Sequence, residues 1–188
     1  MNSKKGRLVL YTGSSGVGKG TIMSELLKRD DNIRLSVSNT TRAPRDGEID
    51  GVHYNFVTKE QFEDLISKDG FLEYAQYCEN YYGTPKKQVE DMLADGKCVF
   101  LEIEVQGGLQ ILEKYPDVLS IFILPPSMEV LSERLHGRGT EDEETIQKRL
   151  TEAKNEISFK DRYKYNVVND NLETAVVEIL DILKKEYC

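Results

Sequence analysis

A glycine-rich segment near the N-terminus carries a lysine at the spacing that phosphate binding requires. The segment reads Gly13-Ser14-Ser15-Gly16-Val17-Gly18-Lys19-Gly20-Thr21. It follows an apolar run at residues 8–11 and precedes apolar residues at helical spacing, so we expect a strand, a turn and a helix. Glycines let successive N–H groups point inward, the helix adds its positive end, and Lys19 supplies a mobile charge. These features predict a phosphate-binding loop; the alternative is an ordinary glycine turn.

The residue after the lysine departs from the usual pattern of such loops. Gly20 stands where a serine or threonine hydroxyl commonly binds Mg²⁺, and Thr21 follows one place later. The loop therefore predicts nucleotide binding, but it offers magnesium no obvious hydroxyl ligand. The ending Gly-Lys-Gly-Thr resembles that of nucleoside monophosphate kinases more than that of GTPases or motor ATPases.

Arginines gather in two further segments. Arg42 and Arg45 lie in a polar loop at 38–48 that also carries several hydroxyls. Arg134 and Arg138 are four residues apart where a glycine-rich loop begins. Guanidinium groups match phosphate oxygens, so the first pair suits a monophosphate and the second suits a lid over transferring phosphates. The alternative for both is a charged, solvated surface segment.

Three glutamates stand in strand-like segments. Glu73 lies among the aromatic residues of 71–77, and Glu102 and Glu104 end the apolar run at 97–104. Side chains alternate along a strand, so we expect Glu102 and Glu104 to point the same way. This run resembles the second strand motif of P-loop proteins, whose carboxylate faces magnesium or its waters, which makes Glu102 the candidate on the metal side. Solvated strand carboxylates are the alternative.

The apolar pattern places these segments in an α/β fold. Strands are expected at 8–11, 34–37, 52–57, 71–77, 97–104, 118–124 and 165–169. Apolar strands that alternate with helices imply a mainly parallel sheet flanked by helices, with ligands beyond the carboxyl ends of the strands. We predict one domain over 1–188, with a core at about 1–37 and 96–188, a small mixed α/β insertion at about 38–95 and a helical lid at about 134–150.

Composition restricts the class of protein. The chain has 188 residues, a formal net charge of −8 and three cysteines. An acidic chain argues against broad nucleic-acid binding, and no apolar run is long enough to span a membrane. An odd number of cysteines without metal-ligand spacing argues against a disulfide framework, which makes a reduced, cytoplasmic setting the default. The oligomeric state does not follow from these features.

The order of the motifs over nearly the whole chain resembles the guanylate kinase family. The most specific segments are Ser38-x-Thr40-Thr41-Arg42-x-x-Arg45-x-x-Glu48, Asn80-Tyr81-Tyr82-Gly83-Thr84 and Arg134-x-x-x-Arg138-Gly139-Thr140. The resemblance implies a P-loop NTPase fold with a GMP-binding insertion, and transfer of the γ-phosphoryl group of ATP to GMP and dGMP with Mg²⁺. This chain departs from the common family pattern at Ser14, Gly20, Glu102 and Glu104, where many relatives carry proline, a hydroxyl residue and aspartates.

The resemblance also implies roles for individual residues. Four would hold the GMP phosphate: Arg42, Arg45, Tyr54 and Tyr82. Four would serve the base or ribose: Glu73 at guanine N1–H and the exocyclic amine, Ser38, Thr84 and Glu104. ATP would be bound by the loop from Gly13 to Thr21 and by Asn169 near the adenine. Phosphoryl transfer would depend on Lys19, Arg134, Arg138 and Arg149, with Glu102 facing magnesium directly or through water.

The implied reaction needs little acid–base chemistry. A phosphate monoester has a second pKa of about 6, so GMP already offers an anionic oxygen at neutral pH. His53 and His136 are isolated in the sequence and are expected to be structural or solvated. Two other functions stay open: a non-catalytic guanylate-kinase-like module that binds phosphopeptides, and a kinase for another small phosphorylated acceptor. The intact loop lysine and the arginine pair at 134 and 138 favour an enzyme over the module.

Overall fold

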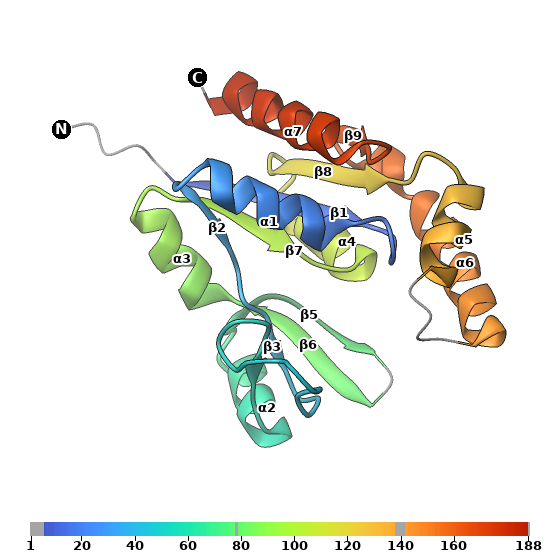
Figure 1. Cartoon of the computed structure of the whole chain (residues 1–188). Helices are drawn as coiled ribbons and strands as arrows, with labels where there is room; N and C mark the ends of the chain where they lie inside the picture. The colour runs from blue at the N-terminus through green and yellow to red at the C-terminus, as the bar shows by residue number, and fades with distance from the viewer. Residues whose placement is uncertain (1–5, 78, 138–141, 188) are drawn as a thin grey trace. The chain divides into compact units, whose positions relative to one another are not determined.

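The computed structural model describes residues 6–77, 79–137 and 142–187, so the predicted site residue Arg138 lies outside the described residues. The chain folds as two compact units (Figure 1). The first unit is built from residues up to Val9, from Asn32–Leu101 and from Gln106–Val118. The second is built from Leu10–Asp31, from Glu102–Val105 and from the residues after Val118.

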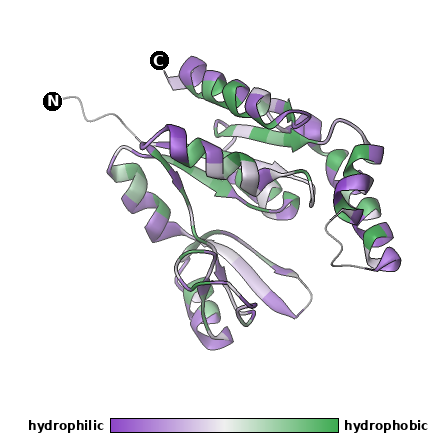
Figure 2. Cartoon of the chain, in the orientation of Figure 1, coloured by the Kyte–Doolittle hydropathy of each residue, from purple (hydrophilic) through white to green (hydrophobic). Residues whose placement is uncertain are grey.

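Five strands form a mainly parallel sheet in the order β2-β7-β1-β8-β9. They are β1 (Arg7–Gly13), β2 (Ile33–Leu35), β7 (Cys98–Glu102), β8 (Leu119–Leu124) and β9 (Tyr165–Val168). β2 runs parallel to β7 with Ile33 opposite Cys98, and β8 runs parallel to β9 with Ile121 opposite Tyr165. β8 is mostly apolar (Figure 2). It is also buried along nearly its whole length, as in strands that are covered on both faces.

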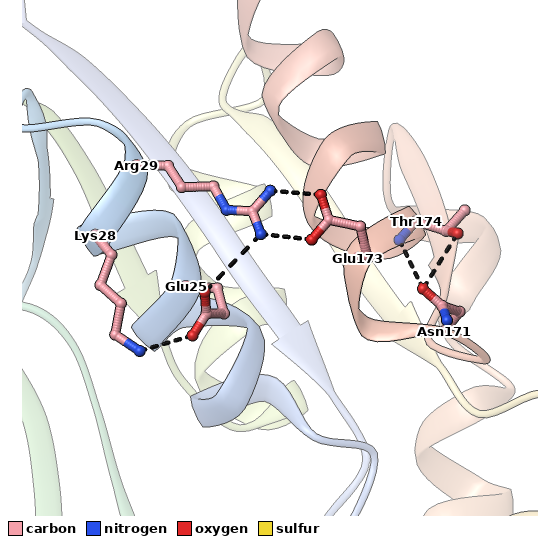
Figure 3. Close-up of polar contacts among 6 residues, drawn as sticks. All are labelled: Glu25, Lys28, Arg29, Asn171, Glu173 and Thr174. Atoms are coloured by element: carbon pink, nitrogen blue, oxygen red, sulfur yellow. Dashed lines mark hydrogen bonds and ion pairs between the residues drawn. The ribbon is translucent and has the colours of Figure 1, made fainter.

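The second unit packs its long helices in two pairs. α1 (Lys19–Arg29) lies against α7 (Leu172–Tyr187), where Arg29 donates to both carboxylate oxygens of Glu173 at 2.8 and 2.5 Å (Figure 3). α5 (Met128–His136) packs on α6 (Glu143–Ile157) through a small apolar core. A 3₁₀ helix (Lys160–Arg162) precedes β9. Within the described ranges no helix is long and apolar enough to cross a membrane.

The first unit carries a second, four-stranded sheet in the order β4-β3-β6-β5. Its strands and helices are β3 (Asn39–Thr40), β4 (Asn55–Phe56), α2 (Lys59–Ser67), β5 (Phe71–Tyr77), β6 (Asn80–Pro85), α3 (Lys86–Ala94) and, from Gln106 onward, α4 (Val105–Lys114). Phe62 of α2 stacks on Phe71 and Tyr81 with ring centroids 4.3 and 5.2 Å apart. A Cβ at Gly83 would lie 3.0 Å from both phenylalanine rings, so this packing requires glycine in β6.

Two strands are shorter than the sequence pattern predicts. In the segment at 52–57 the strand covers Asn55–Phe56, after an isolated bridge between Tyr54 and Asp50. The amides of Val52 and His53 both donate to the carbonyl of Ile49 and form a turn instead. The strand expected at 97–104 ends at Glu102, since α4 already begins at Val105. Burial still alternates from Leu101 to Glu104, and the charge of Glu104 acts on Glu102, so the expected shared direction of the two carboxylates stays a prediction.

Candidate active site

The phosphate loop, residues 13–21, joins β1 to α1 in the second unit. Gly16 and Gly18 have φ angles of +84° and +96°, a conformation that L side chains rarely adopt. A Cβ at Gly18 would also lie 2.5 Å from the Nδ2 atom of Asn169. α1 begins at Lys19 with no side-chain cap and no acidic residue in its first turn. Its N-terminal amides and positive end are therefore suited to an external anion.

Lys19 folds back over its own loop. Its Nζ atom donates to the carbonyl of Gly13 at 2.5 Å and to that of Ser14 at 3.2 Å. The hydroxyl of Tyr11 donates to the Lys19 carbonyl at 3.1 Å and secures the start of the helix. The ammonium group is thus held at the loop by neutral acceptors, which a charged phosphate oxygen can replace with a stronger bond.

Three glutamates interact electrostatically around this lysine. Glu102 is half-buried: burial raises the pKa of its carboxyl, the charge of Lys19 lowers it and that of Glu104 raises it. The pKa of Glu156 is raised to about 7, first by burial and then by Glu104, while Lys19 and a hydrogen bond from the Ser15 N–H oppose the rise. A carboxylate of α6 therefore reaches the amide of a loop that is built to bind anions.

Glu156 was not singled out by the sequence analysis. It lies seven residues after Arg149 on α6, with the buried Ala153 between them, so the two charged side chains share one helix face. Arg149 was already a candidate for the phosphates. The seven-residue spacing is therefore the signal that could have identified Glu156.

The described residues predicted around ATP lie together at the loop. Arg134 donates to the carbonyl of Asn169 at 2.8 Å and to that of Val17 at 3.5 Å. Asn169 is buried, and its Nδ2 atom donates to the same Val17 carbonyl at 2.8 Å. Arg149 donates to the Oγ atom of Ser15 at 3.5 Å. The structure thus brings Arg134 of α5, Arg149 of α6 and Asn169, the residue directly after β9, to the phosphate loop.

The first unit contains a buried carboxylate paired with a hydroxyl. Thr84 donates through Oγ1 to Oε1 of Glu73 at 2.6 Å, and the two residues are 0% and 4% exposed. Burial raises the pKa of Glu73, whereas hydrogen bonds from Thr84 and the positive charge of Lys114 lower it. An ionised carboxylate has more lone pairs than Thr84 uses. Glu73 can therefore accept further N–H donors from a ligand.

Arginine, glutamate and two tyrosines form a second cluster in the first unit. Arg42 donates to both carboxylate oxygens of Glu48, at 3.0 and 2.9 Å, and the amide of Arg45 donates to Glu48 at 2.7 Å. These bonds hold the pKa of Glu48 at about 2. The Arg42 guanidinium lies 5.5 Å from the ring centroid of Tyr54, whose ring is 6.0 Å from that of Tyr82. The cluster presents a guanidinium held in place and two tyrosine hydroxyls, which are suited to a phosphate.

Two further residues predicted for GMP, Ser38 and Glu104, lie in different units. Ser38 is half-buried directly before β3, and its carbonyl accepts from the amide of Asn55 at 2.9 Å. Glu104 belongs to the second unit, where it is exposed and acts on Glu102 and Glu156. All the residues predicted for GMP except Glu104 therefore lie in the first unit.

The fold and the phosphate loop together define a class of protein. A strand of a mainly parallel sheet runs through a glycine-rich loop into a helix that begins with lysine, which is the architecture of P-loop nucleotide-binding proteins. Within that class the chain belongs to the guanylate kinase family, because the model of that family matches residues 5–186.

Individual relatives match nearly the whole chain. A guanylate kinase of Halalkalibacterium halodurans is 50% identical over 188 residues, which are 100% of this chain and 92% of the relative. One of Clostridium perfringens strain SM101 is 52% identical over 186 residues, 99% of this chain and 86% of the relative. The crystal structure of guanylate kinase from Anaplasma phagocytophilum matches with a TM-score of 0.76 and 37% identity, covering 100% of this chain and 88% of the other. The predicted family and α/β fold are confirmed.

Proposed function

We propose that this protein transfers the γ-phosphoryl group of ATP to GMP, giving ADP and GDP for guanine nucleotide metabolism. The observation that carries the proposal is the buried pair of Glu73 and Thr84. Guanine presents two N–H groups on its pairing edge, and one carboxylate accepts both. Adenine presents an unprotonated nitrogen there, which leaves a buried acceptor unpaired and is strongly disfavoured. Membership of the family supports the same substrate.

The cluster around Arg42 is proposed to hold the phosphate of GMP. Arg42 is already oriented by Glu48, and Arg45, Tyr54 and Tyr82 supply further donors in the same unit. A fixed guanidinium matches phosphate oxygens in a bidentate manner and loses little freedom on binding. The residues of the first unit that are proposed to bind GMP address the base and the phosphate rather than the ribose, so we propose dGMP as a second acceptor.

The phosphate loop is proposed to hold ATP. Its backbone amides and Lys19 would bind the outer phosphates, and Asn169 would lie near the adenine. Arg134, Arg149 and Arg138 would neutralise the charge that develops on the transferring group. Glu104 would assist at the base or ribose of GMP.

Charge neutralisation and alignment account for the chemistry without a general base. The GMP phosphate is already anionic at neutral pH, and transfer requires two anions to be held in line while their charge is neutralised. Both histidines are exposed and bonded locally: His53 accepts from the Ile49 amide at 3.0 Å, and His136 pairs with Glu143 at 2.9 Å. Neither histidine is therefore assigned a part in the reaction.

Magnesium is proposed as the cofactor, held mainly by ATP. The described part of the chain contains no group of three or more His, Cys, Asp or Glu side chains that could hold a metal ion. The carboxylate of Glu102 interacts with Lys19 at the loop. A single carboxylate suits Mg²⁺, because this ion keeps several waters and takes its other ligands from phosphates. Bound there, Mg²⁺ would neutralise phosphate charge.

Glu102→Gln tests this role. It should raise the Mg²⁺ concentration needed for half-maximal turnover by about tenfold. An unchanged Mg²⁺ requirement would show that Glu102 does not face the metal.

The decisive experiment measures nucleoside diphosphate formation from Mg-ATP with GMP, AMP, UMP and dTMP as separate acceptors. We expect rapid transfer to GMP and little to the other three. Guanine binding without transfer would instead indicate the binding-module function. Transfer to a different base would keep the phosphate chemistry but remove guanine recognition from Glu73.

A further inference from the structure

Strand β5, which carries Glu73, lies at the edge of the four-stranded sheet. In the order β4-β3-β6-β5 of the described residues it pairs with β6 alone, so its outer carbonyls face no described strand of that sheet. Two of these carbonyls accept hydrogen bonds from side chains of α4. Lys114 donates through Nζ to the carbonyl of Leu72 at 2.8 Å, and Gln110 donates through Nε2 to that of Tyr74 at 3.0 Å. The two bonds fall on the residues directly before and after Glu73.

The backbone at this point departs from a regular ladder. Phe71 lies opposite Pro85 and Tyr74 lies opposite Gly83, so β5 advances three residues while β6 advances two. The extra residue falls between Phe71 and Tyr74, on the segment that contains Glu73. Such a bulge interrupts the ladder and changes the direction of the side chains on it. The orientation of Glu73 therefore depends on more than pairing with β6.

The donors on α4 are spaced to hold this segment. Gln110 and Lys114 are four residues apart, so they lie on one face of the helix. Their two bonds lie on either side of Glu73 at the outer edge, while Thr84 of β6 binds the Glu73 carboxylate. The positive charge of Lys114 also favours the ionised form of Glu73, the form that can accept two N–H groups.

We propose that Lys114 and Gln110 are positioning residues for Glu73: by holding the bulged outer edge of β5, they set the direction of the carboxylate and so the preference for guanine. The inference rests on the proposed function, in which Glu73 accepts the N1–H and the exocyclic amine of guanine. It concerns selectivity for the acceptor and not the binding of ATP.

The test compares steady-state kinetics with GMP and with IMP, which lacks the exocyclic amine. Lys114→Met and Gln110→Met remove the donors with little change of shape, and Lys114→Arg keeps a cationic donor. Lys87→Met is the matched control, because Lys87 is an exposed lysine of α3 in the same unit that pairs with Asp91 at 2.8 Å. We expect Lys114→Met to raise the KM for GMP about tenfold, with a smaller rise for Gln110→Met.

Three further readouts distinguish positioning from a general loss of structure. The KM for ATP should stay within about twofold of the native value, the ratio of GMP to IMP efficiency should fall, and Lys114→Arg should restore most of that ratio. In the protein without GMP, the carboxyl of Glu73 followed by carbon-13 NMR should titrate at higher pH in Lys114→Met than in Lys87→Met.

The outcomes separate this inference from the proposed function. If the native chain phosphorylates GMP but both methionine variants keep the native KM for GMP and the native ratio of GMP to IMP, the positioning role is overturned and the function stands. If the native chain does not phosphorylate GMP, the proposed function is overturned and the inference with it.

Discussion

The phosphate loop and the surroundings of Glu73 present polar groups to a ligand in different ways. In the loop, the groups suited to an anion are backbone amides and one lysine, all within residues 13–21. Around Glu73, the groups are side chains from separate elements: Thr84 is eleven residues away, and the charge of Lys114 comes from α4. The loop depends on local backbone conformation, whereas the Glu73 surroundings depend on how β5, β6 and α4 pack.

On the proposed function, this difference separates phosphate chemistry from the choice of acceptor. Backbone amides bind any suitably placed phosphate, because they do not distinguish one nucleotide from another. A buried carboxylate is selective, because a wrong base leaves it unpaired. Changes in the loop should therefore reduce transfer to every acceptor, whereas changes around Glu73 should alter which acceptor is used.

The largest expected effect is at the loop lysine. Lys19→Ala should lower kcat by about 10³-fold, because it removes a positive charge that stabilises the transferring phosphates. The loss should be equal for GMP and dGMP. Rates measured at saturating substrates test this, with Lys28→Ala as the control, since Lys28 is exposed on the same helix and pairs with Glu25. A loss confined to one acceptor would contradict the division between the two regions.

The next effect concerns the buried carboxylate. Glu73→Gln should lower kcat/KM for GMP by about 100-fold, because the amide keeps one acceptor but sets an NH₂ group against the donors of guanine. The KM for ATP should not change. Glu63→Gln on α2, an exposed site in the same unit, is the control. Equal losses for GMP and AMP would contradict a role in base selection.

A smaller effect is expected at Glu48, whose carboxylate acts by holding the guanidinium of Arg42. Glu48→Gln should raise the KM for GMP by about tenfold, since Arg42 loses a charged partner that fixes its guanidinium. The second unit offers a matched control in Glu173→Gln, which weakens an equivalent two-oxygen contact to Arg29 (Figure 3). That control should leave the KM for GMP within about twofold of native. If both variants raise it alike, Glu48 has no specific part in binding.

The smallest effect should appear in the pH dependence of stability. The ordinary pKa of glutamate is 4.5, and in the folded protein that of Glu156 is about 7. Between these values the folded state keeps a proton that the unfolded state has released, so the free energy of unfolding falls as pH rises. Glu156→Gln should remove the contribution of Glu156 to this fall, gaining about 1–2 kcal/mol relative to native between pH 5 and pH 8, with solvent screening of the half-buried carboxylate included.

Urea denaturation at the two pH values measures that difference. Glu178→Gln, an exposed position on α7, is the control. A constant difference in unfolding free energy between Glu156→Gln and native at both pH values would show that Glu156 titrates normally.

Features that depend on neighbours in the sequence were predictable. Threonine is a residue type that caps helices, and at the start of α2 the Oγ1 atom of Thr58 accepts from the Gln61 amide at 3.2 Å. The apolar run of β8 also indicated a buried strand. The segment at 52–57 was mispredicted because its alternating residues fit a strand, while hydrogen bonds to the Ile49 carbonyl favour a turn.

By itself the sequence determined the phosphate loop, the alternation of strands and helices, and the residue types able to bind a guanine nucleotide. A glycine loop can be read from nine consecutive residues because its conformation is local. Only the tertiary structure placed Glu156 at the Ser15 amide and set Lys114 and Gln110 beside Glu73. Those relations depend on packing between distant segments, and burial and charge at a residue are decided by neighbours that periodicity along the chain does not identify.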